Sequence, residues 1–195
     1  MAREFTEAEA ARHNDLVQRG WSLAERHLQF NEGGRGRPGW FVRSRLNRAI
    51  RYYEEALRIN PEGWSSMWAL GKIYQRLGQH RIALVWFRRA FELNADQPDV
   101  AREAGLSALD CGEVQLAVDL CTTAKILRPE DPGLRANLAL AYMMSGDDTS
   151  AIECAQRAVA MCPEDEVSKS VLRLVNAVAN GSRNRPRALV DIKSR

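Results

Sequence analysis

Long apolar runs, paired cysteines and clustered histidines are all missing from this sequence. No apolar stretch approaches the roughly 18–20 residues that cross a bilayer. The four cysteines of the 195-residue chain form no C-x-x-C pair, and the three histidines are scattered. We therefore expect neither a metal nor a cofactor. The cysteines are interpreted as small, buried apolar side chains in a reducing compartment.

Catalytic motifs are missing as well. The chain has no G-x-S-x-G sequence, and the segment GGRGRPG at 33–39 lacks the Gly-Lys-Ser/Thr ending of a phosphate-binding loop. The sequence therefore predicts a protein that is not an enzyme and has no small-molecule substrate. The first residues, MAREFTEAEAARHND, are charged and include acids, unlike a signal or transit peptide. We expect a soluble protein of the cytoplasm.

A large excess of one charge is also lacking, because the net charge is only +3. Arginine is nevertheless concentrated in residues 31–48 and 181–195, which flank a mildly acidic body. These segments are either a solvated loop and tail, or contacts to an acidic partner or to phosphate. The candidates for acidic-partner contacts are Arg35, Arg37 and Arg43.

What the sequence does contain is a repeat. The phrase AIRYYEEALRINP at 49–61 returns in related form every 34 residues, at 83–95, 117–129 and 151–163. Two alanine columns run through these phrases: Ala49, Ala83, Ala117 and Ala151, then Ala56, Ala90, Ala124 and Ala158. Before each of the last three phrases a glycine favours a turn between two helices, namely Gly78, Gly112 and Gly146. Small residues at Gly71, Gly105 and Ala139 allow the paired helices to approach closely.

This pattern resembles the tetratricopeptide repeat family. The resemblance implies an all-α, right-handed superhelix, an α-solenoid of antiparallel helix pairs, with about four units and a C-terminal capping helix. The predicted repeat domain is 1–180, followed by a basic flexible tail at 181–195. Within the domain we predict an irregular first unit at 6–61 with a Gly/Arg-rich insertion at 31–40. Three regular units follow at 64–97, 98–131 and 132–165, and the capping helix is predicted at 166–180.

The two ends depart from the regular pattern. In the first unit the predicted packing positions are Leu16, Gly20, Leu23, Trp21 and Leu28, with Trp40 and Phe41 packing back on the first helix pair. The insertion is expected to be a mobile loop that either guards the groove or is a tolerated surface feature. In the tail, residues 188–192 offer a short docking segment as the alternative to a frayed end.

The resemblance also implies that the first helix of each pair lines a concave groove. By register the groove residues are Trp68, Lys72, Gln75, Arg76, Arg102, Leu106, Leu109, Asn137, Leu140, Met143 and Met144. The groove is polar and basic at its first end and apolar at its second. This predicts a partner with apolar anchors and at least one acidic group. The alternative is that Leu106, Leu109 and Met143 are covered by the protein itself or by a second copy.

The preferred interpretation is a non-enzymatic scaffold or adaptor that binds a peptide or helix of a partner protein. One alternative is a chaperone like those of type III secretion, which holds a secreted substrate. Another is nucleic-acid or acidic-surface binding through the arginine-rich loop and tail. The oligomeric state stays open, and self-association is a further alternative.

Overall fold

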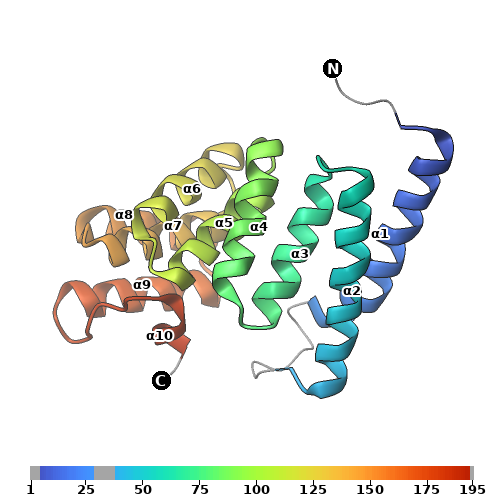
Figure 1. The fold of residues 1–195 in the computed structure, drawn as a ribbon. Helices are drawn as coiled ribbons and strands as arrows, with labels where there is room; N and C mark the ends of the chain where they lie inside the picture. Colours follow the sequence, from blue (N-terminus) through green and yellow to red (C-terminus); the bar gives the residue numbers. More distant parts are fainter. Residues whose placement is uncertain (1–4, 29–37, 194–195) are drawn as a thin grey trace. The chain divides into compact units, whose positions relative to one another are not determined.

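The computed structural model describes residues 5–28 and 38–193 (Figure 1). Within these residues the chain forms ten α-helices and no strand, which confirms the predicted all-α fold. The first four helices are α1 (Glu7–Leu28), α2 (Trp40–Ile59), α3 (Trp64–Arg76) and α4 (His80–Leu93). They are followed by α5 (Pro98–Cys111), α6 (Val114–Leu127), α7 (Pro132–Ser145), α8 (Asp148–Met161), α9 (Glu166–Ala179) and α10 (Leu189–Lys193).

Local chemistry accounts for where the helices begin and end. Gly112 and Gly146 take left-handed backbone conformations with φ of 74° and 95°, directly after α5 and α7. A side chain at such a position is strained, so glycine is favoured there. At the starts of α7 and α9, the carboxylates of Asp131 and Asp165 each accept two backbone N–H groups. These caps satisfy donors that the helix itself leaves unpaired.

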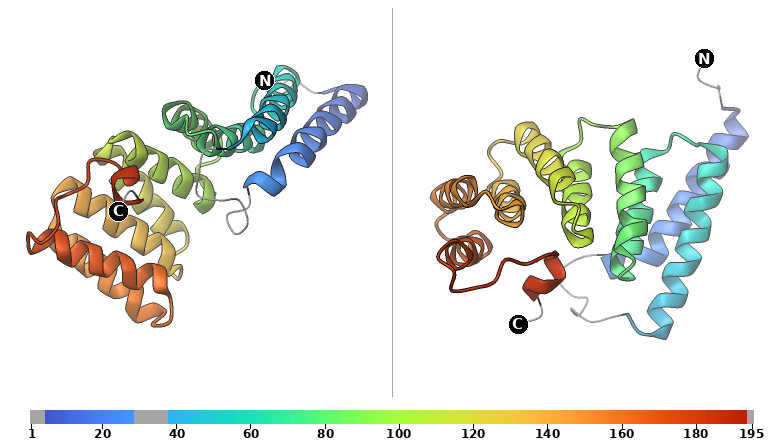
Figure 2. Two further views of the ribbon diagram at one scale, coloured as in Figure 1. Left: turned by 90° about the horizontal axis from the view of Figure 1, so that it is seen from below. Right: turned by 60° about the vertical axis from the view of Figure 1, so that its left-hand side comes forward.

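The helices fall into two compact units, Met1–Asn94 and Ala95–Arg195. Unit 1 contains the pairs α1–α2 and α3–α4, with α1 also packed beside α3. Unit 2 contains the pairs α5–α6 and α7–α8, with α9 against both helices of the second pair and α10 against α5. Figure 2 shows the antiparallel pairs within each unit. In both units, therefore, the first helices of successive pairs lie next to each other.

In three of the four helix pairs, a glycine of the first helix packs against a larger side chain of the second. A Cβ atom placed on Gly71 would lie 2.6 Å from the Phe87 ring, and one on Gly105 would lie 2.7 Å from the Cys121 sulfur. The predicted close approach at these two glycines is confirmed. Gly20 repeats the arrangement in the first pair, where its Cβ would lie 2.9 Å from the Tyr53 ring.

The alanine columns form the buried seam of both units. Every member of the two columns is at most 1% exposed. Around them, unit 1 packs a cluster that includes Leu46, Tyr53, Leu70 and Ile73. Since alanine is small, the second helices lie close to their neighbours and larger side chains fill the remaining space. The predicted stacking of helix pairs around shared apolar faces is confirmed within each unit.

Three aromatic residues at the N-terminal end differ from the prediction. Trp40 and Phe41 were expected to pack on the first helix pair, but they are 73% and 78% exposed and contact each other edge to face at 4.8 Å. They stand in the first turn of α2, and the buried side of that helix begins only with Leu46. Trp21, another predicted packing position, is 41% exposed, because its neighbour Gly20 is the residue that faces Tyr53.

The insertion predicted at 31–40 lies mostly outside the described residues, and so do Arg35 and Arg37. Arg43, the third candidate for an acidic partner, is exposed on α2. Among the described helices, none combines the length and the apolar character that a bilayer crossing requires.

Candidate functional site

The predicted groove residues of unit 1 lie on α3. On each of α3, α5 and α7, we call the side that carries the predicted groove residues the inner face of that helix. Trp68 is half-buried against the core of unit 1, and the Lys72 Nζ atom lies 5.9 Å from the centroid of its ring. That distance is within the range of a cation–π contact. Gln75 and Arg76 follow one turn later, both half-buried.

Two features make Trp68 a candidate contact. Its indole Nε1 atom is buried and has no hydrogen-bond partner among the described residues. Buried donors are normally satisfied, so an indole N–H without a partner is unusual. The side chain as a whole is only half-buried, which leaves part of the ring at the surface. The aromatic ring, the adjacent cation and the orphan donor together form a strip suited to a polar ligand with an apolar anchor.

In unit 2 the inner face of α5 differs from the prediction in its charge. Arg102 was expected to make this region basic, but it pairs with Asp99 at 3.0 Å and with Glu103 at 3.2 Å. Asp99 also pairs with Arg128 at 3.3 Å. Because each cation faces a carboxylate, the charges cancel locally. Leu106 is half-buried on this face, whereas Leu109 is completely buried.

The inner face of α7 is apolar and largely covered. Asn137 and Leu140 are half-buried, but Met143 is 0% exposed and Met144 is 7% exposed. The alternative that the protein itself covers Leu109 and Met143 therefore accounts for these two residues. The half-buried leucines of α5 and α7 have a counterpart 34 residues further on in α9, Leu174, which the prediction did not include.

The C-terminal segment was predicted to be a flexible tail. Within unit 2, residues 183–192 instead make specific contacts, in line with the docking alternative. The Arg185 guanidinium donates two hydrogen bonds of 2.9 Å to the Asp148 carboxylate and also donates to the Met143 carbonyl. Leu189, at the start of α10, is only 6% exposed.

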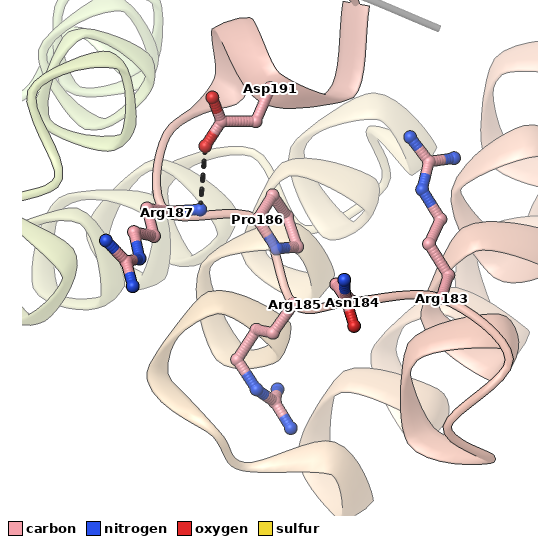
Figure 3. A pocket seen from close by; sticks show the side chains of 6 residues that line it. All are labelled: Arg183, Asn184, Arg185, Pro186, Arg187 and Asp191. Atoms are coloured by element: carbon pink, nitrogen blue, oxygen red, sulfur yellow. Dashed lines mark hydrogen bonds between the residues drawn. The ribbon is translucent and has the colours of Figure 1, made fainter.

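The same segment has its own local order. The Asp191 carboxylate accepts the backbone N–H groups of Arg187 and Ala188, at 2.9 and 3.0 Å, and so caps the first turn of α10. Figure 3 shows a shallow pocket along the segment, lined by Arg183, Asn184, Arg185, Pro186, Arg187 and Asp191. The three arginine side chains leave the segment in different directions, so they do not converge on one anion.

Arg185 and Asp148 form an ion pair, so each side chain stabilises the charged form of the other. The hydrogen bond from Arg185 lowers the pKa of Asp148 and raises the pKa of Arg185. Asp148 lies in the first turn of α8, and Met143 lies in the last turn of α7, where its carbonyl also accepts the backbone N–H of Gly146 at 3.2 Å. Sequence analysis missed this pair, since nothing in the repeat pattern links a basic tail to one particular acid.

The prediction that the cysteines are buried is confirmed only in part. Cys121 is 1% exposed, and burial raises the pKa of its thiol to about 12. Cys111, Cys154 and Cys162 are half-buried rather than buried. In the described part of the chain, no three His, Cys, Asp or Glu residues are grouped in a way that would hold a metal ion.

Comparisons with known proteins agree with the repeat. Two family models described as tetratricopeptide repeat match residues 41–98, 69–134 and 133–165. Superkiller protein 3 of Schizosaccharomyces pombe is 30% identical over 98 residues, which are 50% of this chain and 7% of that protein. The chain thus spans only a small part of this relative's length.

Solved structures show the same fold. A crystal structure of MamA protein superposes with a TM-score of 0.73 at 18% identity, covering 90% of this chain and 86% of that one. YrrB, described as a tetratricopeptide repeat protein with an unusual peptide-binding site, gives a TM-score of 0.62 at 21% identity, covering 69% of each chain. Proteins with these repeats serve as protein-interaction scaffolds. With its repeated helix pairs and these matches, the chain belongs to the tetratricopeptide repeat family.

Proposed function

We propose that this chain is a non-enzymatic scaffold that binds a peptide or helix of a partner protein on the inner face of α3. The observation that carries the proposal is the strip on α3, where half-buried Trp68 lies beside the Lys72 ammonium and keeps an unsatisfied indole donor. Aromatic residues of this kind dominate the energetics of many protein interfaces. They combine a large apolar area with one polar group that fixes orientation.

The strip favours a partner with both apolar and acidic groups. An apolar side chain of the partner would lie on the exposed part of the Trp68 ring. A carbonyl or carboxylate oxygen would accept the indole N–H beside the Lys72 ammonium, whose residue is itself only 5% exposed. In unit 2 Arg102 is already paired with Asp99 and Glu103, so an acidic group of the partner is not expected to bind there.

The test is capture of partners from the source organism's lysate on the immobilised full chain. Two inner-face variants run beside the wild type: Trp68→Ala, which removes the ring, and Gln75→Glu, which adds a negative charge about two turns further along α3. Gln156→Glu is the matched control, because it makes the same chemical change at an exposed position of α8. Far-UV circular dichroism establishes that each variant is folded.

We expect at least one protein to be retained equally by the wild type and the Gln156→Glu control. Each inner-face variant should bind the same protein about tenfold or more weakly than the wild type does. A tenfold loss of affinity corresponds to roughly 1.4 kcal/mol of binding free energy. Equal retention by all four folded proteins would show that the inner face of unit 1 is not the binding surface.

A further inference from the structure

We propose that residues 183–192 are an intramolecular ligand of unit 2, and that the surface beneath them is a second peptide-binding site. Its partner is a basic segment with an arginine and, four residues later, a leucine at the start of a helical turn. This inference goes beyond the proposed function, because it concerns α5, α7 and α8 rather than the strip on α3. We call the surface that receives this segment the strap site; its main groups are Asp148, the Met143 carbonyl and the C-terminal end of α5.

The polar part of the strap site selects for arginine. The Asp148 carboxylate accepts two hydrogen bonds of 2.9 Å from the Arg185 guanidinium. This bidentate geometry suits a guanidinium better than an ammonium. The Met143 carbonyl accepts a further hydrogen bond from the same guanidinium. That carbonyl belongs to the last turn of α7, where the helix dipole favours a cation. Three acceptor atoms from two helices therefore surround one side chain.

The apolar part of the strap site selects for leucine. Leu189 is 6% exposed, although it lies only six residues from the end of the chain, whereas its neighbour Val190 is 52% exposed. The helix that carries Leu189 packs on α5. The Arg187 carbonyl approaches Gly112, where an added Cβ would lie 3.3 Å from that oxygen. A segment crossing this point thus fits closely between its two anchors.

The segment is attached weakly enough for a partner to replace it. Its helix has five residues, too few to be stable without contacts to the rest of the protein. The Arg185 and Asp148 side chains are 34% and 33% exposed, so salt screens their attraction. Covalent linkage supplies an effective concentration on the order of millimolar, which a partner with the same anchors and additional contacts can exceed. The site therefore alternates between its own segment and a competing one.

The first test uses a fluorescent peptide with the sequence of residues 182–193, SRNRPRALVDIK, and the full chain. In the variant Arg185→Glu/Leu189→Asp both anchors of the chain's own segment are lost, while the strap site keeps all its residues. We expect the peptide to bind this variant about tenfold or more tightly than the wild type, where the attached segment competes. The matched control is Arg183→Glu, which changes an arginine of the same segment that makes no ion pair with Asp148. It should behave like the wild type.

The receiving side is tested by charge exchange. We call the Arg185→Glu/Leu189→Asp protein the unlatched variant. Adding Asp148→Ala to it should abolish binding of the peptide. In the full chain, Asp148→Arg combined with Arg185→Glu should restore slow hydrogen exchange of α10, which each single change accelerates. A structural role of Asp148 unrelated to Arg185 would not produce this rescue.

The proposal is overturned if the peptide binds neither protein, or binds the wild type and the unlatched variant equally. It is also overturned if light scattering shows a wild-type dimer and an unlatched monomer, because the strap site would then receive the segment of a second copy. Trp68→Ala should leave peptide binding unchanged. This inference and the proposed function can therefore fail separately.

Discussion

Replacing Gly71 with alanine tests the closest helix contact of unit 1. A Cβ at this position would lie 2.6, 2.6 and 2.8 Å from three carbons of the Phe87 ring, whereas ordinary van der Waals contacts begin near 3.4 Å. Phe87 is 0% exposed, so its ring has no free space to move into. Overpacking of this kind costs about 1–3 kcal/mol. Alanine gains about 1 kcal/mol over glycine inside a helix, which leaves a net loss of roughly 0–2 kcal/mol.

A double-mutant cycle separates the two contributions. Phe87→Ala alone should destabilise the protein by about 3–5 kcal/mol, because it removes a completely buried ring. In that background the clash is gone, so Gly71→Ala should raise the stability by about 1 kcal/mol. The two changes together reproduce the arrangement found at Ala139 and Ala155, which are both 0% exposed. The expected coupling energy between the two positions is therefore about 1–3 kcal/mol.

The assay is urea unfolding of the four proteins, followed by far-UV circular dichroism. The midpoints give the stability changes, and constant slopes establish that the unfolding transition is the same in each protein. If Gly71→Ala changes the free energy of unfolding equally in both backgrounds, the coupling is zero. That result would refute the argument that the glycine is needed for the approach of Phe87.

Four further predictions follow from burial and backbone geometry. Gly112→Ala and Gly146→Ala should each lower the free energy of unfolding by about 1–2 kcal/mol, because both glycines have a positive φ. Only Gly112→Ala should also speed hydrogen exchange in α10, since its Cβ would lie 3.3 Å from the Arg187 carbonyl of the C-terminal segment. The pKa of His27 is lowered by burial and by nearby arginines, so the unfolded chain binds more protons than the folded one. The free energy of unfolding should therefore fall as the pH falls below about 6.5. Urea melts at several pH values should show a smaller decrease for His27→Gln than for the wild type. Cys121 should be the slowest of the four cysteines to be alkylated at pH 8, as followed by mass spectrometry, because its thiol is buried and protonated. Trp40→Ser should change the unfolding free energy by less than about 0.5 kcal/mol, since the ring is exposed, and a larger loss in a urea melt would contradict this.

The sequence predicted the repeated part of the fold well, because the same information occurs several times. A small residue in one helix and a large one in the next recur at Gly71 with Phe87 and at Gly105 with Cys121. Contacts of this kind join residues less than one repeat apart, so the period and the residue types are sufficient to identify them. The all-α fold, the helix pairs and the buried alanine columns follow from that pattern.

The candidate site was predicted less completely. Register identified Trp68 and Lys72 on α3, whose distance and burial only the structure supplies. Register also included Leu109 and Met143, which the structure shows to be completely buried. Their exposure depends on how closely the neighbouring helices pack around them, which register alone does not give.

The sequence by itself determined the helix pairs and their buried seam, since hydrophobic periodicity and small residues act locally and are repeated. Only the tertiary structure decided that Trp40 is exposed and that the C-terminal segment packs on unit 2. The pairing of Arg185 with Asp148 joins two residues far apart in the sequence, and it occurs once. Such a contact depends on where the chain returns after α9, which is set by packing in three dimensions and leaves no periodic trace in the sequence.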